Sequence, residues 1–443
     1  MFALCCAVML AGVARAQNGI NSPYSQYGIG LGNQPYNQPY VSSLGGVVNT
    51  LSFQNMINPF NPASYGSVAM QSFVFDMGLS IEMLTMKNSA NSLYDADGSM
   101  GYLSFAFPIA KWWKTGFGIM PLSDVNYYST QPSLGEAWGE AHTVYQGVGG
   151  VSQIFWGHAF NIVGGNDDSK PALRLGFNVN YLNGSIMRST SYEFTGRDSS
   201  YFMQSRKRKD TYVSNLTYDF GLQYDQPVGE KYLLGFGVTF KPHREMNVKD
   251  TAIHYTYVPV SSMESIRDTI FPASGEESGY MSTIEQPATV GVGVSFSRKD
   301  KWLVALDGTF SEWGGMKYTE NPNINLFGTG TIKYSKSTRV ALGVQMLGDK
   351  NESRYMRRVT YSAGLHYEDG KLYFCPVGGN ESKLNEWGFG VGMSLPMRKG
   401  RSVLNLSVAY SSFGTTDLLR RNAVSIGLSI GTCESWFVKK KYN

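Results

Sequence analysis

The sequence predicts an all-β protein: a transmembrane antiparallel β-barrel of about fourteen strands, with an N-terminal plug in its lumen. Three observations predict it. Segments of strand length alternate apolar residues with small or polar ones. The connections between these segments alternate between short and long. Charged residues make up only 16% of the chain, whereas typical soluble proteins have roughly 25%.

The alternation has a period of two residues, which is typical of β-strands. In residues 288–297, ATVGVGVSFS, valine and phenylalanine occupy one face, and glycine and serine occupy the other. The runs extend for roughly 10–15 residues, long enough to cross a bilayer at a tilt. An apolar lipid face and a small, polar inner face are therefore expected. The same pattern recurs in residues 232–240, 339–346, 403–410 and 423–432.

Short and long connections follow one another along the chain, as in barrels with short periplasmic turns and long extracellular loops. The short links lie near residues 108–115, 226–231, 298–301, 348–354 and 396–401, with a further one near 161–171. The long polar links lie near residues 86–98, 126–141, 186–210, 247–284, 314–330, 370–384 and 412–420.

Aromatic residues gather at both ends of the predicted strands, where lipid meets water. Those beside short links are Trp112, Trp113, Trp302 and Trp436, and those at long-loop ends are Trp313, Trp387, Tyr127 and Tyr128. Buried aromatics of a soluble β-protein are the alternative. The membrane interpretation accounts for the placement at both ends, and it predicts an integral protein of the Gram-negative outer membrane.

The N-terminal region predicts two segments before the barrel. Residues 1–16 contain an apolar stretch followed by Ala14-Arg15-Ala16 and are expected to be a cleaved secretory signal. Residues 17–69 do not alternate and are rich in Asn, Pro, Gly and Ser, so they are expected to form a plug, or hatch, inside the barrel. A disordered periplasmic tail is the alternative. Residues 70–437 are the expected barrel and residues 438–443 a periplasmic tail.

Asn61-Pro62-Ala63, just before the first predicted strand, and the upstream small-residue stretch Leu44-Gly45-Gly46 resemble the FadL/TodX family of outer-membrane transporters for hydrophobic compounds. The stretches NSPYSQYGIG and WFVKKKY are similar to its Bacteroidetes branch. The resemblance implies a hatch that plugs the lumen, a ligand held among apolar interior residues, and a kink in the third strand that opens the wall sideways into the membrane.

The third predicted strand contains a proline that supports this last expectation. Proline lacks the N–H that a barrel ladder needs, so it is usually confined to strand ends or bulges. Pro121 instead interrupts the run TGFGIMPLSDVNYY, and Gly116 and Gly118 precede it. A local break in the wall is the hypothesis, and a harmless bulge near the rim is the alternative. The candidate gating residues are therefore Asn61, Pro62, Ala63, Gly116, Gly118 and Pro121.

Enzyme motifs are not expected to be functional here. Gly427-Leu428-Ser429-Ile430-Gly431 matches the nucleophile elbow of hydrolases, but no helical pattern follows it, so Ser429 is expected to lie in a strand. The five histidines show no metal-ligand spacing. No catalytic residue, metal or cofactor is predicted. A net charge of +4 gives no argument for nucleic acid.

The run Arg206-Lys207-Arg208-Lys209 falls in a long, predicted extracellular loop. A solvated loop is the favoured interpretation, and contact with lipopolysaccharide phosphates is the alternative. Membrane lipid and lipopolysaccharide are the expected surroundings of the barrel.

The sequence therefore predicts a monomeric barrel that passes small hydrophobic molecules, fatty-acid-like or aromatic, passively and exits them sideways. The alternative is a barrel of the same fold that serves as a structural or shuttle subunit of an outer-membrane assembly, such as a β-barrel assembly or type IX secretion complex, with other outer-membrane proteins as partners. An outer-membrane lipase using Ser429 is a third possibility.

Overall fold

The computed structural model describes most of the chain from Ser22 onward. The predicted signal peptide, residues 1–16, and the predicted tail, residues 438–443, lie outside the described residues, as does Trp436. The described residues are 22–26, 28–32, 36–89, 91–135, 139–164, 170–194, 202–260, 263–271, 279–313, 318–319, 332–334, 336–349, 352–370, 372–374, 382–397, 402–416 and 418–435.

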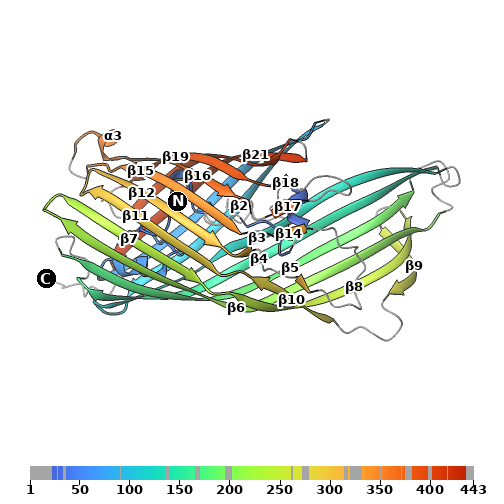
Figure 1. The fold of residues 1–443 in the computed structure, drawn as a ribbon, viewed down its shortest axis with the longest axis horizontal. Coiled ribbons are helices and arrows are strands. Elements are labelled where there is room, and N and C mark those ends of the chain that lie inside the picture. Colours follow the sequence, from blue (N-terminus) through green and yellow to red (C-terminus); the bar gives the residue numbers. More distant parts are fainter. Residues whose placement is uncertain are drawn as a thin grey trace, which may run out of the picture.

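The wall is a closed antiparallel barrel of 14 strands, which confirms the predicted fold (Figure 1). Each wall strand pairs with its neighbour in the chain, and the last strand pairs with the first to close the ring. The wall strands are β1 (Ser72–Lys87), β2 (Ser92–Pro108), β3 (Trp113–Gly135), β4 (Gly139–Val163), β5 (Ala172–Phe194), β6 (Gln204–Val228), β7 (Tyr232–Lys241) continued by β8 (Arg244–Val260), β10 (Tyr280–Gln286) continued by β11 (Thr289–Arg298), β12 (Trp302–Ser311), β15 (Ser337–Met346), β16 (Thr360–Asp369), β19 (Glu386–Pro396), β20 (Ser402–Thr415) and β21 (Leu419–Ser435).

Two wall strands are interrupted where proline falls in the sequence. Pro242 separates β7 from β8, and Pro287 separates β10 from β11. The two halves of an interrupted strand still pair with the same neighbour. Strand β6, for example, pairs with β7 along one part of its length and with β8 along another. The interruptions follow from the missing proline N–H, which removes a ladder hydrogen bond.

The remaining elements are short or lie outside the ring. None of the helices among the described residues is long and apolar enough to cross a membrane. These elements are a hairpin partner of β8, β9 (Met263–Phe271); a short strand on β10, β13 (Tyr318–Thr319); a three-stranded sheet of β14 (Ile332–Tyr334), β17 (Leu372–Phe374) and β18 (Ser382–Lys383); and the helices η1 (Pro23–Gln26), α2 (Pro39–Ser43), η2 (Pro62–Ser67) and α3 (Tyr355–Arg358).

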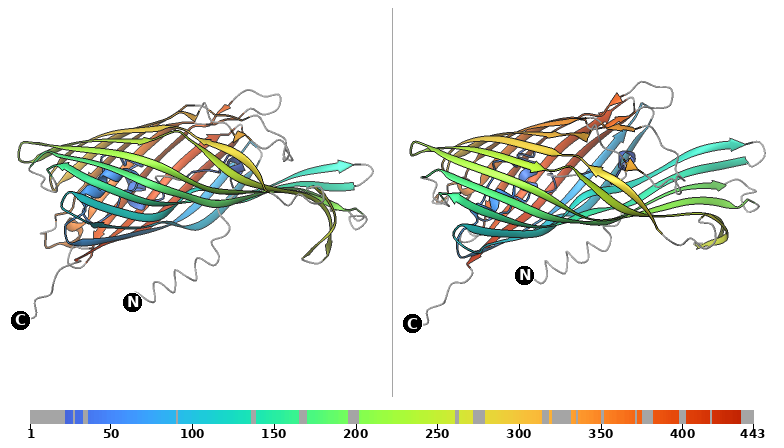
Figure 2. Two further views of the ribbon diagram at one scale, coloured as in Figure 1. Left: turned by 90° about the horizontal axis from the view of Figure 1, so that it is seen from below. Right: turned by 60° about the horizontal axis from the view of Figure 1, so that its bottom comes forward.

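The two ends of the barrel differ in shape. The short links, such as residues 229–231 and 299–301, lie together at one end, here called the short-turn end. At the opposite, long-loop end, strands β3 to β6 and β8 run on well past the other strands (Figures 1 and 2). Together with β9 they form a projecting sheet beyond the closed part of the barrel (Figure 2).

The projecting sheet corrects the expectation of long loops. Residues 186–210 and 247–284 were expected to be polar links, yet β5 continues to Phe194, β6 begins at Gln204, and β8, β9 and β10 occupy much of the second range. Their polarity misleads because strands beyond the lipid need no apolar face. The backbone pairing of the barrel simply continues there.

The basic run is part of strand β6 and not a loop, which corrects its expected placement. Alternate residues of a strand point to opposite faces. Lys209 is therefore buried, with its Nζ 3.9 Å from Asp250 Oδ2, while Arg206 pairs with Glu193 at 3.6 Å and with Glu264. The charges are divided between the two faces of the strand, and Arg206, Arg208 and Lys209 pair with carboxylates.

The two faces of the wall follow the predicted alternation. On β11, Val292 and Val294 are 42% and 45% exposed on the outer surface, whereas Gly291 and Gly293 face the lumen beside Asn49. Tyr127 is an exception to the predicted aromatic belt. It is buried in the lumen, and its neighbour Tyr128 is exposed, because consecutive strand residues cannot share a face.

Candidate functional site: the occupied lumen

Residues 36–68, here called the inner segment, lie inside the ring of wall strands (Figure 2). Its helix α2 packs against β16, β19, β20, β21 and β1, and its helix η2 packs against β3, β4, β5 and β6. The two short helices therefore touch opposite parts of the wall. Most of the segment is buried, including Leu44, Val47 and Tyr65. The bulk of the lumen at this level is filled by the chain itself.

Glycines on the inner face of the wall let the inner segment approach the strand backbones. A Cβ at Gly364 would lie 2.1 Å from the carbonyl carbon of Leu44, and a Cβ at Gly237 would lie 2.1 Å from Asn49 O. Neither position has room for a side chain. The small inner faces seen in the sequence are thus explained by contact with residues 36–68, and not by an open channel.

Asp307 of β12 holds the middle of the inner segment. Its Oδ2 accepts hydrogen bonds from Val48 N at 2.6 Å and from Asn49 N at 2.8 Å. The Asn49 side chain in turn accepts from Thr239 Oγ1 of β7 at 2.8 Å. Gln223 of β6 donates to Asn49 O at 2.9 Å. Three wall strands therefore converge on one residue of the inner segment.

Other wall strands hold the rest of the inner segment. Arg339 of β15 donates to Gly46 O at 2.8 Å and to Gly45 O at 3.2 Å. Asn178 of β5 accepts from Tyr65 Oη at 3.0 Å and donates to the Pro59 carbonyl at 2.9 Å. Hydrogen bonds to buried partners of this kind contribute about 1 kcal/mol each, and more where a charge takes part.

Strands β16 and β1 also hold the inner segment by hydrogen bonds. Ser43 Oγ lies 2.6 Å from Ser362 Oγ of β16. Asp76 of β1 accepts from Ile57 N at 3.2 Å. Burial raises the pKa of Tyr40 and of Tyr65 above the usual range, so both hydroxyls stay protonated.

The predicted motif Asn61-Pro62-Ala63 begins helix η2 and faces β5 and β6. Asn61 Oδ1 accepts from Ala63 N at 3.1 Å and so caps the helix, which is a favoured role of Asn at this position. Asn61 Nδ2 donates to Asn49 O at 2.6 Å. Pro62 lies against Gly176 and Gly221 of the wall. The motif thus joins two turns of the inner segment to each other and to the wall.

The other predicted residues lie on β3. Pro121 falls at a register shift in the pairing of β3 with β4, between Pro121 and Ser123. The Pro121 carbonyl accepts from Asn37 Nδ2 at 3.1 Å. Gly116 lies near the ring of Tyr65, and a Cβ at Gly118 would lie 2.8 Å from the Phe155 ring. Both predicted groups therefore lie beside helix η2: Asn61, Pro62 and Ala63 begin it, and Gly116 lies against its Tyr65. Their gating role stays a prediction.

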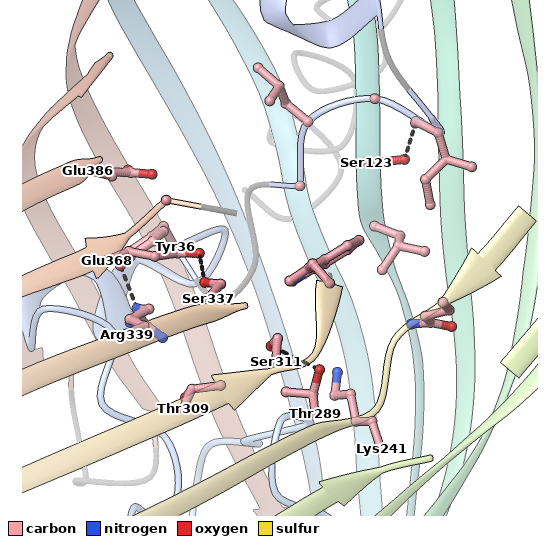
Figure 3. A pocket seen from close by; sticks show the side chains of 18 of the residues that line it. Tyr36, Ser123, Lys241, Thr289, Thr309, Ser311, Ser337, Arg339, Glu368 and Glu386 are labelled. Atoms are coloured by element: carbon pink, nitrogen blue, oxygen red, sulfur yellow. Dashed lines mark hydrogen bonds between the residues drawn. The ribbon is translucent and has the colours of Figure 1, made fainter. Parts of the chain in front are cut away.

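Two cavities lie next to the inner segment. The first, of about 300 Å³, has Arg339, Glu368 and Glu386 on one side and Lys241 on another (Figure 3). Its apolar lining includes Leu122. The second, of about 420 Å³, lies beside β2 and β3 and is lined by polar and apolar groups in similar measure. The first cavity is within the size range of ligand pockets, and its lining is predominantly apolar, as in such pockets, with a few charged groups facing it.

Ser429 lies in β21 between β20 and β1, as its alternating context predicted. It is 1% exposed and accepts a hydrogen bond from Asn405 Nδ2 at 3.0 Å. No histidine is among its hydrogen-bond partners in the described part of the chain. The described residues hold no group of three or more His, Cys, Asp or Glu side chains able to bind a metal.

Sequence reasoning missed the wall residues that hold the inner segment, notably Asp307, Arg339 and Asn178. Each is a buried charged or amide side chain at an inward position of its strand. That position is the signal that could have identified them. Their partners could not be read from the sequence, because Asn49 and Asp307 are separated by 258 residues.

The fold and the filled lumen define a class: β-barrels of the outer-membrane type with an internal N-terminal segment. The family model described as BamG matches residues 1–443. The chain therefore belongs to the BamG family. No curated protein is detectably similar to it in sequence.

Solved structures share the fold. The monoaromatic hydrocarbon channel CymD matches with a TM-score of 0.53 at 12% identity, covering 89% of this chain and 97% of that one. The toluene transporter TbuX of Ralstonia pickettii matches with 0.52 at 12% identity, covering 89% and 97%. A FadL homologue of Pseudomonas aeruginosa matches with 0.53 at 11% identity, covering 90% and 98%. These neighbours are channels and transporters and not enzymes. They agree in architecture with the FadL/TodX resemblance, although the family model that matches has a different name.

Proposed function

We propose that this protein is an outer-membrane barrel with a permanently closed lumen, which serves as a structural subunit of a larger outer-membrane assembly. In this proposal residues 1–16 are a signal peptide, 17–69 a fixed plug, 70–437 the barrel and 438–443 a tail. The short-turn end faces the periplasm, and the projecting sheet faces outward.

The observation that carries the proposal is the fixing of the inner segment from all sides. Side chains of β1, β5, β6, β7, β12, β15 and β16 bond to it. At about 1 kcal/mol for each hydrogen bond, moving it as a unit costs far more than thermal energy supplies. A mobile gate requires the opposite arrangement, few contacts and low local stability.

Two further observations support a structural role. The first cavity beside the inner segment has charged side chains, among them Glu368 and Lys241, within its otherwise apolar lining, and a hydrophobic cargo that contacted them would desolvate them at a cost. The projecting sheet also offers an extended surface beyond the rim of the barrel, where a partner protein could dock.

The test is gentle detergent extraction of the native protein from outer membranes, with mass spectrometry of co-purifying proteins and small molecules. A stoichiometric complex without a bound hydrophobic molecule is the expected result. A lone barrel that carries fatty acids or aromatic compounds would contradict the proposal.

Transport is the second candidate, and a specific observation favours it. Beside the register shift at Pro121, the pairing of β2 with β3 stops at Leu103 and Ile119, and a cavity lies at the same level. The solved neighbours include hydrocarbon channels. In this alternative Asn61, Pro62 and Ala63 gate the lumen, and Gly116, Gly118 and Pro121 form a sideways exit for hydrophobic molecules.

Uptake of radiolabelled toluene and of a long-chain fatty acid distinguishes the two candidates. Transport predicts faster uptake in cells that express the protein than in vector controls, and a changed rate in a Pro121→Ala variant. The structural role predicts vector-level uptake for both proteins.

A further inference from the structure

The wall contains a seam between β2 and β3. Their pairing ends at Leu103 and Ile119, yet β2 extends back to Ser92 along β1, and β3 continues to Gly135 along β4. Beyond this point each strand therefore has an edge that the other does not cover. An uncovered strand edge offers unpaired N–H and C=O groups to any extended chain.

The protein covers part of this edge with its own N-terminus. Residues 22–26 and 28–32, here called the strap, lie along β3. Leu31 and Asp124 form an isolated antiparallel bridge, with Leu31 N donating to Asp124 O at 3.0 Å and Asp124 N donating to Leu31 O at 2.9 Å. Ser22 N donates to Asn126 O at 2.7 Å, and Asn126 N donates to Ser25 Oγ at 3.1 Å.

The strap makes an incomplete strand. Between its two contact points it turns through the 3-10 helix η1 and through Gly28 and Gly30, both with positive φ. A Cβ at Gly30 would lie 2.3 Å from Asp124 O, so glycine is required for the close approach. A regular strand would form a continuous ladder along the same edge. The strap therefore leaves pairing capacity that a better strand could use.

The strap is held less extensively than the inner segment. Apart from β3, Arg188 of β5 donates to Gln26 O at 3.1 Å and to Gly28 O at 2.6 Å. Tyr24 Oη donates to Leu419 O of β21 at 2.6 Å, and its ring packs against Phe413 of β20. Leu31 lines both cavities, so the strap lies between the lumen cavity and the one beside the seam. Releasing it would uncover the edge of β3 without disturbing the inner segment.

We propose that the edge of β3 at Asp124 and Asn126 is a strand-addition site that the strap occupies in cis, and that its partner is an extended segment of another polypeptide. Strand addition takes its affinity from main-chain hydrogen bonds, and the strap already makes such bonds there. The cis strap competes at the high effective concentration of a tethered segment. A partner must therefore offer a longer ladder, or the strap must first be loosened.

The existence of a partner rests on the proposed structural function, but the edge can be tested without one. The probe is a fluorescent synthetic peptide with the sequence of residues 22–32, SPYSQYGIGLG. Its binding to the full chain in nanodiscs is measured by fluorescence anisotropy. The control peptide carries an N-methyl group on Leu31, which removes the N–H that donates to Asp124 O.

Three variants of the protein change how strongly the strap competes with the peptide for the edge of β3. A Gly30→Val substitution forces the strap away from β3 while leaving the edge intact. Arg188→Met removes the hydrogen bonds from β5 to the carbonyls of Gln26 and Gly28. A Leu31→Cys/Asp124→Cys disulfide, with Cys375 and Cys433 replaced by Ser, locks the strap. Leu31 and Asp124 form a hydrogen-bonded antiparallel pair. The Cα atoms of such pairs lie about 5.5 Å apart, which is within the Cα–Cα range of disulfides.

The expected result is weak binding to the wild type, binding at least about tenfold tighter to both loosened variants, and none to the locked form. The N-methyl peptide should bind none of them. Heat-resistant migration on gels checks that each variant is folded, and Arg188→Met serves if Gly30→Val fails this check. Absence of binding to a folded, loosened variant, or equal binding of the two peptides, would overturn the strand-addition site. Neither result alters the co-purification test, so the two proposals fail separately.

Discussion

Asp307 of β12 accepts a hydrogen bond of 2.8 Å from the backbone amide of Asn49, in the middle of the inner segment. The same carboxylate oxygen accepts from Val48 N. The side chain belongs to a wall strand and the amides belong to residues that fill the lumen, so this contact ties the two parts of the molecule together. The account of a closed barrel depends on contacts of this kind.

Replacing Asp307 with alanine should therefore destabilise the inner segment. Hydrogen bonds to charged groups contribute about 1.5–3 kcal/mol each, and two amides would lose their partner. We expect a free-energy loss of about 3 kcal/mol in urea unfolding in detergent micelles. Asp268→Ala, at an exposed position of β9, is the control and should change stability by less than about 0.5 kcal/mol. Equal effects of the two substitutions would contradict the assigned role.

Gly364 provides a steric test of the same packing. A valine there would place its Cβ where the Leu44 backbone lies, 2.1 Å away. The inner segment must then move or the barrel must distort, so Gly364→Val should abolish heat-resistant migration of the folded barrel on gels. Leu365→Val is the matched control, because Leu365 is 55% exposed on the outer face. Normal migration of the glycine variant would show that residues 44–45 do not need to lie against β16.

Arg339 tests the inner segment near α2. Arg339→Met removes the donors to Gly45 O and Gly46 O and to the Tyr36 hydroxyl, leaving buried acceptors unpaired. Unpaired buried groups cost about 1–3 kcal/mol each. Hydrogen exchange of the amides of residues 44–49 should accelerate at least about tenfold. Arg357→Met, at an exposed ion pair, should leave these rates unchanged.

Ser429→Ala tests the hydrolase alternative. Ser429 accepts a hydrogen bond from Asn405 and is buried between neighbouring strands. Its removal takes an acceptor from the buried Asn405 amide and should reduce stability by about 1–3 kcal/mol. Hydrolysis of p-nitrophenyl esters by the purified protein should equal the background rate before and after the substitution. Serine-dependent hydrolysis would revive the lipase interpretation.

The sequence predicted the wall of the barrel and a segment inside it, but not the contacts that join the two. Alternation of the kind seen in residues 288–297 depends only on which side of a strand faces lipid, so it marks strands locally, and the position of Pro121 in the third strand followed from it. Polar strands beyond the lipid, such as the ends of β5 and β6, carry no such signal and were taken for loops. Contacts between the inner segment and the wall join residues hundreds of positions apart, which local patterns cannot reveal.

The most direct test of the closed lumen is a disulfide that locks the inner segment to the wall. Ser43 Oγ and Ser362 Oγ lie 2.6 Å apart, so Ser43→Cys and Ser362→Cys should crosslink in a variant without Cys375 and Cys433. Uptake of a radiolabelled long-chain fatty acid is then measured in cells with the unlocked barrel, the locked barrel or an empty vector. A closed structural barrel predicts three equal rates. Faster uptake by the unlocked barrel that the lock abolishes and reductant restores would show that the lumen opens, and would contradict the account.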